Sequence, residues 1–352
     1  MSDLTDRIDE AGRWDEIIDV RTPAEFADDH VPGAINLPVL SDAERAVVGT
    51  IYVQESRLKA RRLGAALVAR NIATHLEGPL NDKPGSYAPL IYCWRGGQRS
   101  LAMATVLSQV GWRPSRLAGG YKTYRRAVMA ALYDGEPLAN LVLLDGYTGS
   151  AKTEILGRLA ALGVQTLDLE GMAAHRGSLF GGLGQPQPSQ KRFESALFGA
   201  LSDLDPGRPI VVEAESSKIG QINLPPVLWA GMTAAPRIEI DAPAEARARY
   251  LLAAYGDIAA DPRRVSAALA ALPGRHGRGR LAAWQGLLAA GDLAALVATL
   301  MEFHYDPAYE RSRRRHEKPP LARLAVTDLL APDQEDAARK IAQCLAARET
   351  PP

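Results

Sequence analysis

The sequence predicts an α/β protein of two domains: it is long enough for two, it alternates short β-like runs with helical stretches, and this alternation starts afresh part-way along. The chain has 352 residues, and a domain usually takes about 100 to 200. Hydrophobic residues make up 47% of it and charged residues 23%. These proportions exclude disordered, collagen-like and coiled-coil chains, and the lack of a repeat at a fixed period excludes a solenoid.

The first domain is expected at residues 1–135. Strands are predicted at 16–20 (EIIDV) and 89–92 (PLIY), and a helix at 55–70, from the period of their apolar residues. Gly, Pro and charged residues gather at 133–138 (YDGEPL), just before a new apolar run. Such residues favour turns and loops between elements, so we place the domain boundary there.

The second domain is expected at residues 136–352. It begins with a strand at 141–144, a glycine-rich turn and a helix, and further strands are predicted at 164–169, 209–213 and 237–240. Strands that alternate with helices predict a parallel sheet. From about 243 onward, Ala, Leu and Arg with apolar spacings of three and four predict a helical C-terminal region, 243–352.

Charge and cysteine content narrow the class of protein. Lys plus Arg equals Asp plus Glu at 41 each, so net charge gives no sign of a polyanionic partner, although it leaves a local basic face open. Cys93 and Cys344 are the only cysteines, which argues against a disulfide scaffold and fits a reducing compartment. The N-terminus is polar and no apolar run approaches the roughly 18 residues of a membrane span. We therefore expect a cytoplasmic protein with no membrane contact.

A cysteine follows the strand 89–92 directly. Cys93 leads into a polar, glycine-rich loop ahead of a predicted helix: Trp94, Arg95, Gly96, Gly97, Gln98, Arg99 and Ser100. Backbone N–H groups at a helix N-terminus bind anions, and nearby arginines favour the thiolate over the thiol. The pattern predicts a catalytic cysteine in an anion-binding loop rather than a buried structural cysteine.

The first domain resembles the rhodanese sulfurtransferase family. The resemblance rests on Asp19-Val20-Arg21, Glu25-Phe26 and the run 30–38 (HVPGAINLP). It implies a rhodanese-like fold in which Cys93 is the persulfide-carrying residue. The spacing from Cys93 to Arg99 also fits the loop of cysteine phosphatases, a less favoured alternative, because Tyr92 stands where those enzymes usually carry His and no nearby Asp is an evident general acid.

The second domain opens with a phosphate-binding pattern between a strand and a helix. The pattern comprises Gly146, Tyr147, Thr148, Gly149, Ser150, Ala151, Lys152 and Thr153. Its N–H groups and Lys152 are expected to bind a diphosphate. Ala151 departs from the usual glycine. Its methyl group is tolerated in an αR backbone and strained at positive φ, so a degenerate loop kept only for folding stays open.

Acidic and polar residues after the next strands are candidates for the same site. Thr153 is a candidate Mg²⁺ ligand, and Glu213 or Glu215 could hold the metal through water, unless these glutamates merely end a strand. The polar loop after the strand 164–169 adds Asp168, Glu170, His175, Arg176 and Ser178. The alternative interpretation is that this loop only connects two elements and is exposed to solvent. No zinc site is expected, because His175 has no His or Cys partner at ligand spacing.

The two domains together resemble the tRNA 2-selenouridine synthase family. The match adds DLEG, HRGS, QPSQ and E-x-E-S in the second domain to the runs 37–52 and 119–126 in the first. The resemblance implies an enzyme that attaches a geranyl group from geranyl diphosphate to wobble 2-thiouridine, then replaces the geranylthio group with selenium from selenophosphate. It implies that Cys93 takes part in selenium transfer, that the phosphate loop binds a departing diphosphate, and that Mg²⁺ assists.

The expected partner is tRNA, bound at its anticodon region. Binding of its phosphates requires a cationic surface on the protein. The candidate contacts are Arg278, Arg280, Arg313, Arg314 and Arg315, unless these arginines are only solvated helix faces. An enzyme that supplies selenophosphate is a possible second partner. Two other functions stay open: a sulfurtransferase fused to a nucleotide-dependent kinase, and a non-catalytic protein that binds RNA or phosphate. Phe180, Leu183 and Phe193 could line a prenyl pocket or belong to the core.

Overall fold

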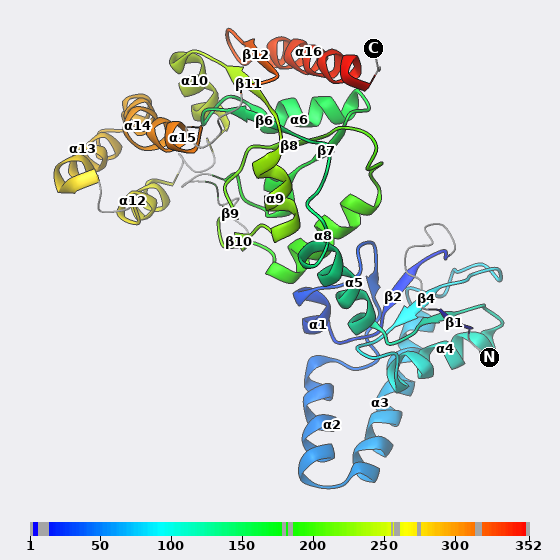
Figure 1. Ribbon diagram of the computed structural model, residues 1–352. Coiled ribbons are helices and arrows are strands. Elements are labelled where there is room, and N and C mark those ends of the chain that lie inside the picture. The colour runs from blue at the N-terminus through cyan, green and yellow to red at the C-terminus, as the bar shows by residue number, and fades with distance from the viewer. Residues whose placement is uncertain are drawn as a thin grey trace. The chain divides into compact units, whose positions relative to one another are not determined.

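The computed structural model describes residues 3–5, 14–177, 181, 186–254, 256, 261–272, 276–313 and 319–349 (Figure 1). The chain forms two compact units. The first comprises Met1–Gly135 and Pro188–Gly199, and the second comprises Glu136–Gln187 and Ala200–Pro352. The described residues contain no helix that is both long and apolar enough to cross a membrane.

The first unit contains a five-stranded parallel sheet in the order β1-β5-β4-β2-β3. The strands are β1 (Asp3–Thr5), β2 (Ile17–Asp19), β3 (Ile35–Asn36), β4 (Leu90–Tyr92) and β5 (Ser115–Leu117). Residues 16–20 and 89–92, predicted as strands, supply the adjacent β2 and β4, in which Asp19 lies opposite Tyr92. Because both strands are parallel, the residues that follow them emerge at the same sheet edge.

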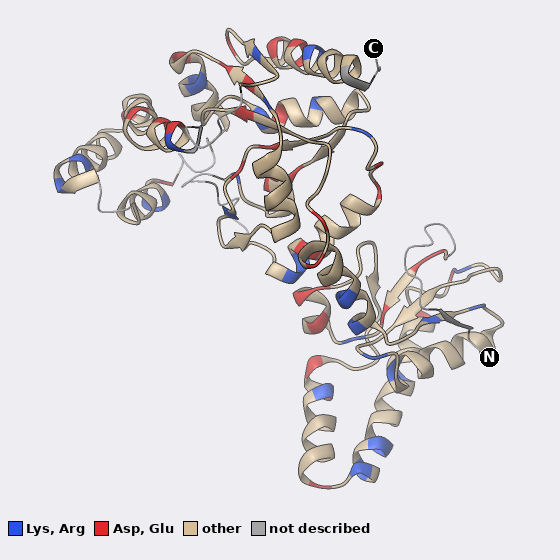
Figure 2. Cartoon of the chain, in the orientation of Figure 1, with Lys and Arg blue, Asp and Glu red and all other residues tan. Residues whose placement is uncertain are grey.

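Five helices and part of a sixth complete this unit: α1 (Pro23–Asp28), α2 (Asp42–Gln54), α3 (Arg57–Glu77), α4 (Gln98–Val110), α5 (Tyr121–Tyr133) and the first ten residues of α8 (Gln190–Ser202). Thr22 and Ser41 form capping boxes with Glu25 and Glu44 at the starts of α1 and α2. Figure 1 shows α2 and α3 as an antiparallel pair that extends away from the sheet. Lys and Arg recur along α3 (Figure 2).

The start of α8 belongs to the first unit although it lies beyond residue 135, where the sequence placed the boundary. Phe193 and Ser195 are fully buried in this unit and Glu194 is 1% exposed. Glu194 pairs with Arg125 of α5 and accepts a hydrogen bond from the Tyr133 hydroxyl at 2.5 Å. An amphipathic helix packs wherever its apolar and polar groups find partners, whatever its position in sequence.

The second unit contains a five-stranded parallel sheet in the order β12-β11-β6-β8-β7. Its strands are β6 (Leu141–Gly146), β7 (Gln165–Leu167), β8 (Ile210–Glu213), β11 (Arg237–Asp241) and β12 (Ala322–Ala325), and a separate antiparallel pair comprises β9 (Lys218–Ile219) and β10 (Ile222–Asn223). All six residues of β6 are buried, as expected of a central parallel strand. The chain adds strands first to one side of β6 and then to the other, which creates a binding crevice at its carboxyl end.

The helices of the second unit include the predicted C-terminal helical region. They are α6 (Lys152–Ala161), α7 (Leu169–Met172), α9 (Pro226–Ala234), α10 (Ala244–Ala254), α12 (Pro262–Ala270), α13 (Gly277–Ala289), α14 (Leu293–Leu300), the π-helical turn η2 (Met301–Tyr305), α15 (Asp306–Arg313) and α16 (Ala331–Glu349). The prediction of a helical region missed β12, which returns to the sheet beside β11. Its four residues are half-buried and exposed in alternation, too short a pattern to stand out between helices.

Replacement of Glu194 by Ala should destabilise the first unit. The change leaves the Arg125 guanidinium, which is 17% exposed, without its carboxylate partner. Breaking a buried ion pair costs about 3–5 kcal/mol, measurable as a shift of the urea midpoint. The matched control is Glu55→Ala at the exposed Glu55–Lys59 pair, which should change the midpoint little. Equal midpoints for the two variants would contradict this role of α8.

Candidate active sites

Cys93 lies where β4 ends and the chain turns toward α4. Its side chain is 3% exposed. The sulfur accepts a hydrogen bond from the N–H of Gly97 at 3.2 Å and lies 3.3 Å from the hydroxyl oxygen of Ser100. A backbone donor, a hydroxyl group and the N-terminus of α4 therefore surround the sulfur.

The start of α5 passes close to the cysteine loop, and glycine makes this approach possible. A Cβ atom at Gly120 would lie 2.1 Å from the carbonyl oxygen of Cys93 and 2.5 Å from the nitrogen of Gly96. The next N–H group, from Tyr121, donates to that Cys93 carbonyl at 2.8 Å, and Lys122 donates to the Trp94 carbonyl at 3.1 Å. The run 119–126 thus fixes the backbone that carries the cysteine.

The two arginines predicted beside Cys93 have different environments. Arg99 is half-buried and donates to both carboxylate oxygens of Glu25, at 2.7 and 3.4 Å. Burial raises the pKa of Glu25, but the hydrogen bond and charge of Arg99 outweigh it and hold the pKa below its usual value. Arg95, in contrast, is exposed, as are Trp94, Gly97 and Gln98 of the same loop. Of the two arginines, Arg95 is therefore the one that is open to solvent.

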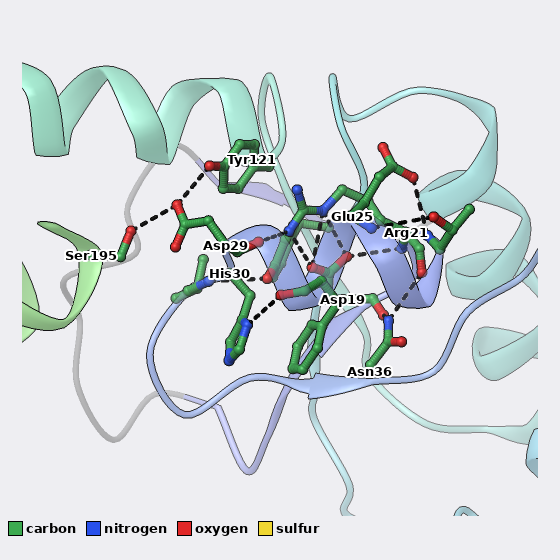
Figure 3. Close-up of polar contacts among 12 residues, drawn as sticks. Asp19, Arg21, Glu25, Asp29, His30, Asn36, Tyr121 and Ser195 are labelled. Carbon is green, nitrogen blue, oxygen red and sulfur yellow. Dashed lines mark hydrogen bonds and ion pairs between the residues drawn. The ribbon is translucent and has the colours of Figure 1, made fainter. Parts of the chain in front are cut away.

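A buried polar network lies behind this loop (Figure 3). The Arg21 guanidinium, 1% exposed, pairs with the Asp19 carboxylate at 2.6–3.0 Å and donates to the Asp29 carbonyl at 2.6 Å. Its central carbon also lies 4.0 Å from the centre of the Tyr121 ring. The Asp29 carboxylate accepts hydrogen bonds from the hydroxyls of Tyr121 at 2.6 Å and Ser195 at 2.9 Å. Residues of β2, α5 and α8 are thereby fixed around one ion pair.

The phosphate-binding pattern lies in the second unit, between β6 and α6. The Lys152 ammonium donates to the Gly146 carbonyl at 2.9 Å and to the Tyr309 hydroxyl at 3.3 Å. Burial lowers the pKa of Lys152, but Tyr309 and the carboxylates of Glu215 and Glu170 around it raise the pKa above its usual value. Lys152 is therefore a stable cation beside the loop.

Ala151 adopts the conformation that the sequence analysis left open. Its φ of 55° and ψ of 34° are left-handed, which costs an L-residue about 1–2 kcal/mol. Its methyl group is 2% exposed and packs in the core cluster that includes Ile155 and Leu159. The loop therefore retains a left-handed residue at this position despite the loss of glycine.

Three glutamates meet beside Thr153. The Thr153 hydroxyl oxygen lies 2.7 Å from Glu213 Oε1 and 3.1 Å from Glu170 Oε2. Glu213 is 0% exposed, and its Oε2 has no hydrogen-bond partner among the described residues. Burial first, and neighbouring carboxylates second, raise the pKa of Glu170 and Glu213 to about 8. Burial and Glu213 likewise raise the pKa of Glu215 to about 7, although Lys152 opposes this.

The polar loop 168–178 contributes to this site unevenly. Asp168 caps α7 by accepting from the N–H of Gly171 at 2.7 Å. His175 is half-buried, and burial lowers its pKa. Arg176 lines the cavity described below. A Cβ atom at Gly177 would lie 2.6 Å from Glu170 and 2.8 Å from Glu215, so the loop packs onto the glutamates. Ser178 lies outside the described residues.

A cavity of about 690 Å³ extends from the phosphate-binding loop. Residues 148–153 line one part of it. Its apolar wall, as we call it, comprises Leu143, Trp229, Met232, Leu251, Ala254 and Ala308. Sequence reasoning missed this wall, since its members come from β6, α9, α10 and α15 and share no local motif. Of the prenyl-pocket candidates, Phe193 is core of the first unit, and Phe180 and Leu183 lie outside the described residues.

An ion pair fixes α10 and α15 beside the phosphate-binding loop. Arg247, 4% exposed, donates to both carboxylate oxygens of Asp306 at 2.9 and 2.8 Å. The same guanidinium donates to the Thr148 carbonyl at 3.2 Å and lies 4.9 Å from the Tyr147 ring centre. The pair sets the position of Tyr309, one turn along α15.

Family models match the chain in both units. A rhodanese-like domain matches residues 1–127, and a tRNA 2-selenouridine synthase AAA domain matches residues 139–268. A tRNA 2-selenouridine synthase from Cupriavidus pinatubonensis is 33% identical over 351 residues, covering 89% of this chain and 94% of that protein. The chain belongs to the tRNA 2-selenouridine synthase family.

Other members of the tRNA 2-selenouridine synthase family align over a shorter part. Those from Sulfurovum sp. and Chromohalobacter salexigens are 38% and 39% identical over 66% and 68% of this chain. These alignments span 63% and 65% of the two relatives, slightly less than two thirds of their length. The predicted family and the fold class, a rhodanese-like domain followed by a P-loop domain, are confirmed.

The arginines predicted to contact tRNA remain predictions in this synthase-family chain. Arg278 and Arg280 are exposed in the first turn of α13, where Arg280 lies 4.1 Å from the Phe303 ring centre. The side chain of Arg313, at the end of α15, lies outside the described part of the structure, as do Arg314 and Arg315.

The raised pKa values of the glutamates predict a pH-dependent stability. An acid whose pKa is higher in the folded than in the unfolded state stabilises the fold below its unfolded pKa, and loses that contribution as pH rises through the folded one. Stability should therefore fall between pH 5 and 9, since the folded pKa values reach about 7 to 8. Glu213→Gln should flatten this fall in thermal melts without magnesium, whereas Glu136→Gln, at an exposed position, is the matched control. An unflattened Glu213→Gln profile would contradict the assignment.

Proposed function

We propose that the chain converts wobble 2-thiouridine of tRNA into 2-selenouridine, in two steps carried out at two sites. The observation that carries this proposal is the cavity beside the P-loop, which joins a cationic phosphate site to an apolar wall. Polar residues such as Thr233, Arg237 and Tyr250 also line this cavity, and such groups would suit the base and ribose of a nucleotide-dependent kinase. The apolar wall supports a diphosphate with a hydrocarbon tail, and the family supports tRNA as its acceptor.

The first step is S-geranylation in the second unit. The sulfur of 2-thiouridine attacks C1 of geranyl diphosphate, the bond from C1 to the diphosphate oxygen breaks, and diphosphate leaves with the electron pair. Lys152 and the N–H groups of the loop are placed to stabilise that leaving charge. The apolar wall gives the ten-carbon chain a surface on which to bury its area.

Mg²⁺ fits the oxygen donors beside Lys152. Thr153 and Glu213 would hold it. The buried Oε2 of Glu213, which has no hydrogen-bond partner among the described residues, would then interact with the cation. Mg²⁺ usually takes one or two protein carboxylates together with substrate phosphates and water, and Glu213 would supply one such carboxylate. Bound there, it would neutralise the leaving diphosphate.

The second step is selenium transfer in the first unit. Selenophosphate is an anion, and the loop offers it the start of α4, the N–H of Gly97 beside the sulfur and the exposed Arg95. Water attacks the phosphorus of selenophosphate there, the phosphorus–selenium bond breaks, and phosphate and hydrogenselenide form with no change of oxidation state. Cys93, beside the bound anion, takes part in this transfer. At C2 of the modified base a carbon–selenium bond forms, the carbon–sulfur bond breaks, and geranylthiol leaves. An enzyme that makes selenophosphate would be the supplying partner, and tRNA places the reaction in the cytoplasm.

Nucleoside mass spectrometry tests both steps at once. Thiolated tRNA is incubated with the protein, geranyl diphosphate, Mg²⁺ and selenophosphate, and one small molecule is omitted at a time. We expect geranylated 2-thiouridine without selenophosphate, and 2-selenouridine when it is added. Nucleotide hydrolysis without any change in the tRNA would favour a sulfurtransferase-kinase. Bound but unmodified tRNA would favour a non-catalytic binding protein.

Two substitutions should separate the steps. Lys152→Ala should abolish geranylation because it removes the half-buried cation that would face the leaving diphosphate, yet pre-geranylated tRNA should still be selenated. Cys93→Ser should show the reverse, geranylation without selenation. Each variant is the matched control of the other, with a thermal melt to show that both are folded. Loss of both activities in a folded Cys93→Ser protein would refute the division of labour.

If the apolar wall binds the prenyl chain, its side chains should determine which chain length the enzyme accepts. Ala254→Leu, on α10, adds bulk to the cavity without touching Lys152. A misfit of one methylene group discriminates substrates by about 10- to 200-fold, so kcat/KM for geranyl diphosphate should drop by at least about 10-fold while dimethylallyl diphosphate is spared. Inorganic diphosphate, which has no tail, should inhibit both proteins equally. Equal losses for both prenyl donors would place the tail elsewhere.

A further inference from the structure

Trp94 exposes its indole directly beside the buried Cys93. The chain has five tryptophans, all among the described residues, and Trp94 is the most exposed of them, with 40% of its surface accessible. We propose that Trp94 is a stacking platform for the pyrimidine base at which selenium is exchanged. This inference rests on the function proposed above and names the subsite that holds the nucleotide in the first unit.

The inner side of the Trp94 ring is held by buried groups. Its centre lies 5.2 Å from that of the Tyr121 ring, with an angle of 33° between the planes. Tyr121 is 3% exposed and is fixed from behind by the Asp29 carboxylate at 2.6 Å and the Arg21 guanidinium at 4.0 Å. A ring supported in this way loses little freedom when a second ring binds its exposed side.

The backbone fixes the platform relative to the thiol. The Trp94 carbonyl accepts from the N–H of Lys122 at 3.1 Å, and the carbonyl of the preceding residue, Cys93, accepts from Tyr121 at 2.8 Å. The two consecutive residues point to different surroundings, one side chain 3% exposed and the other 40%. A base stacked on the indole is therefore presented at the mouth of the loop whose N–H donor faces the sulfur.

Arg95 supplies the second half of a nucleotide site. It follows Trp94 directly and is exposed. Single-stranded RNA is commonly bound by aromatic rings that stack on bases together with cations that meet the backbone phosphates. A lone exposed aromatic residue needs no such explanation, but exposed Trp and Arg residues that directly follow Cys93 in the chain match the base and the phosphate of one nucleotide.

The test uses the full chain and an anticodon stem–loop RNA. Trp94→Ala should weaken binding of the stem–loop and raise its KM in the selenation step by about 5- to 150-fold, the loss expected from one base–aromatic stack. Trp94→Phe retains a ring and should recover most of the affinity. The rate of Cys93 alkylation by iodoacetamide should stay the same, which shows that the loop is intact. Unchanged KM and affinity in Trp94→Ala would overturn the proposal.

Photo-crosslinking separates this subsite from the overall reaction. A stem–loop with 4-thiouridine at the wobble position is irradiated with the protein, and the crosslinked peptide is sequenced. A crosslink at Trp94 supports the platform even if the tRNA is never modified, in which case the proposed function alone fails. A crosslink that maps only to other segments overturns the platform even if modification proceeds.

Discussion

Parallel strands that end at one edge of a sheet are the constraint on which both sites depend. In the first unit β2 and β4 are neighbours, so Arg21 and Cys93, which follow them, come together although about seventy residues separate them. In the second unit β6 and β8 are neighbours, and the P-loop therefore meets Glu213. Each unit thus assembles its chemistry by hydrogen bonding two short, buried strands, and the loops beyond them need only the right residue types.

Charged side chains removed from water need a partner of opposite charge at both sites, and the two units differ in how fully they supply one. The first neutralises Arg21 completely with Asp19, which leaves a rigid, inert support for the loop. The second places three carboxylates around a single lysine, so that burial pushes their pKa values into the neutral range. Carboxylates removed from water destabilise the fold when they are charged and no cation neutralises them. Under the function proposed above, a bound Mg²⁺ would offset this excess of acid and stabilise the second site.

Sequence reasoning located the candidate segments that are continuous in the chain, and the chemical roles of their residues stay predictions. The loop from Cys93 to Ser100 and the pattern from Gly146 to Thr153 combine a strand end, glycines and a helix start, so composition alone reveals them. It failed where a contact joins distant segments. Tyr309 lies 157 residues from Lys152, to which it bonds, and Ser195 lies 166 residues from Asp29. Nothing local marks either residue, because a tyrosine or serine on a helix is compatible with many environments.

Ala151 shows how far a glycine pattern can be relaxed. At Gly149, with φ of 84°, a Cβ atom would lie 2.7 Å from Leu251 Cγ and 2.9 Å from the Arg247 carbonyl, so the helix packed on the loop forbids a side chain. At Ala151 the methyl group instead enters the apolar core. Burial of one methyl group stabilises the fold by about 0.8 kcal/mol, whereas the left-handed backbone conformation of Ala151 destabilises it by about 1–2 kcal/mol. The two terms nearly offset each other, and the loop can keep its shape without the glycine that its pattern normally demands.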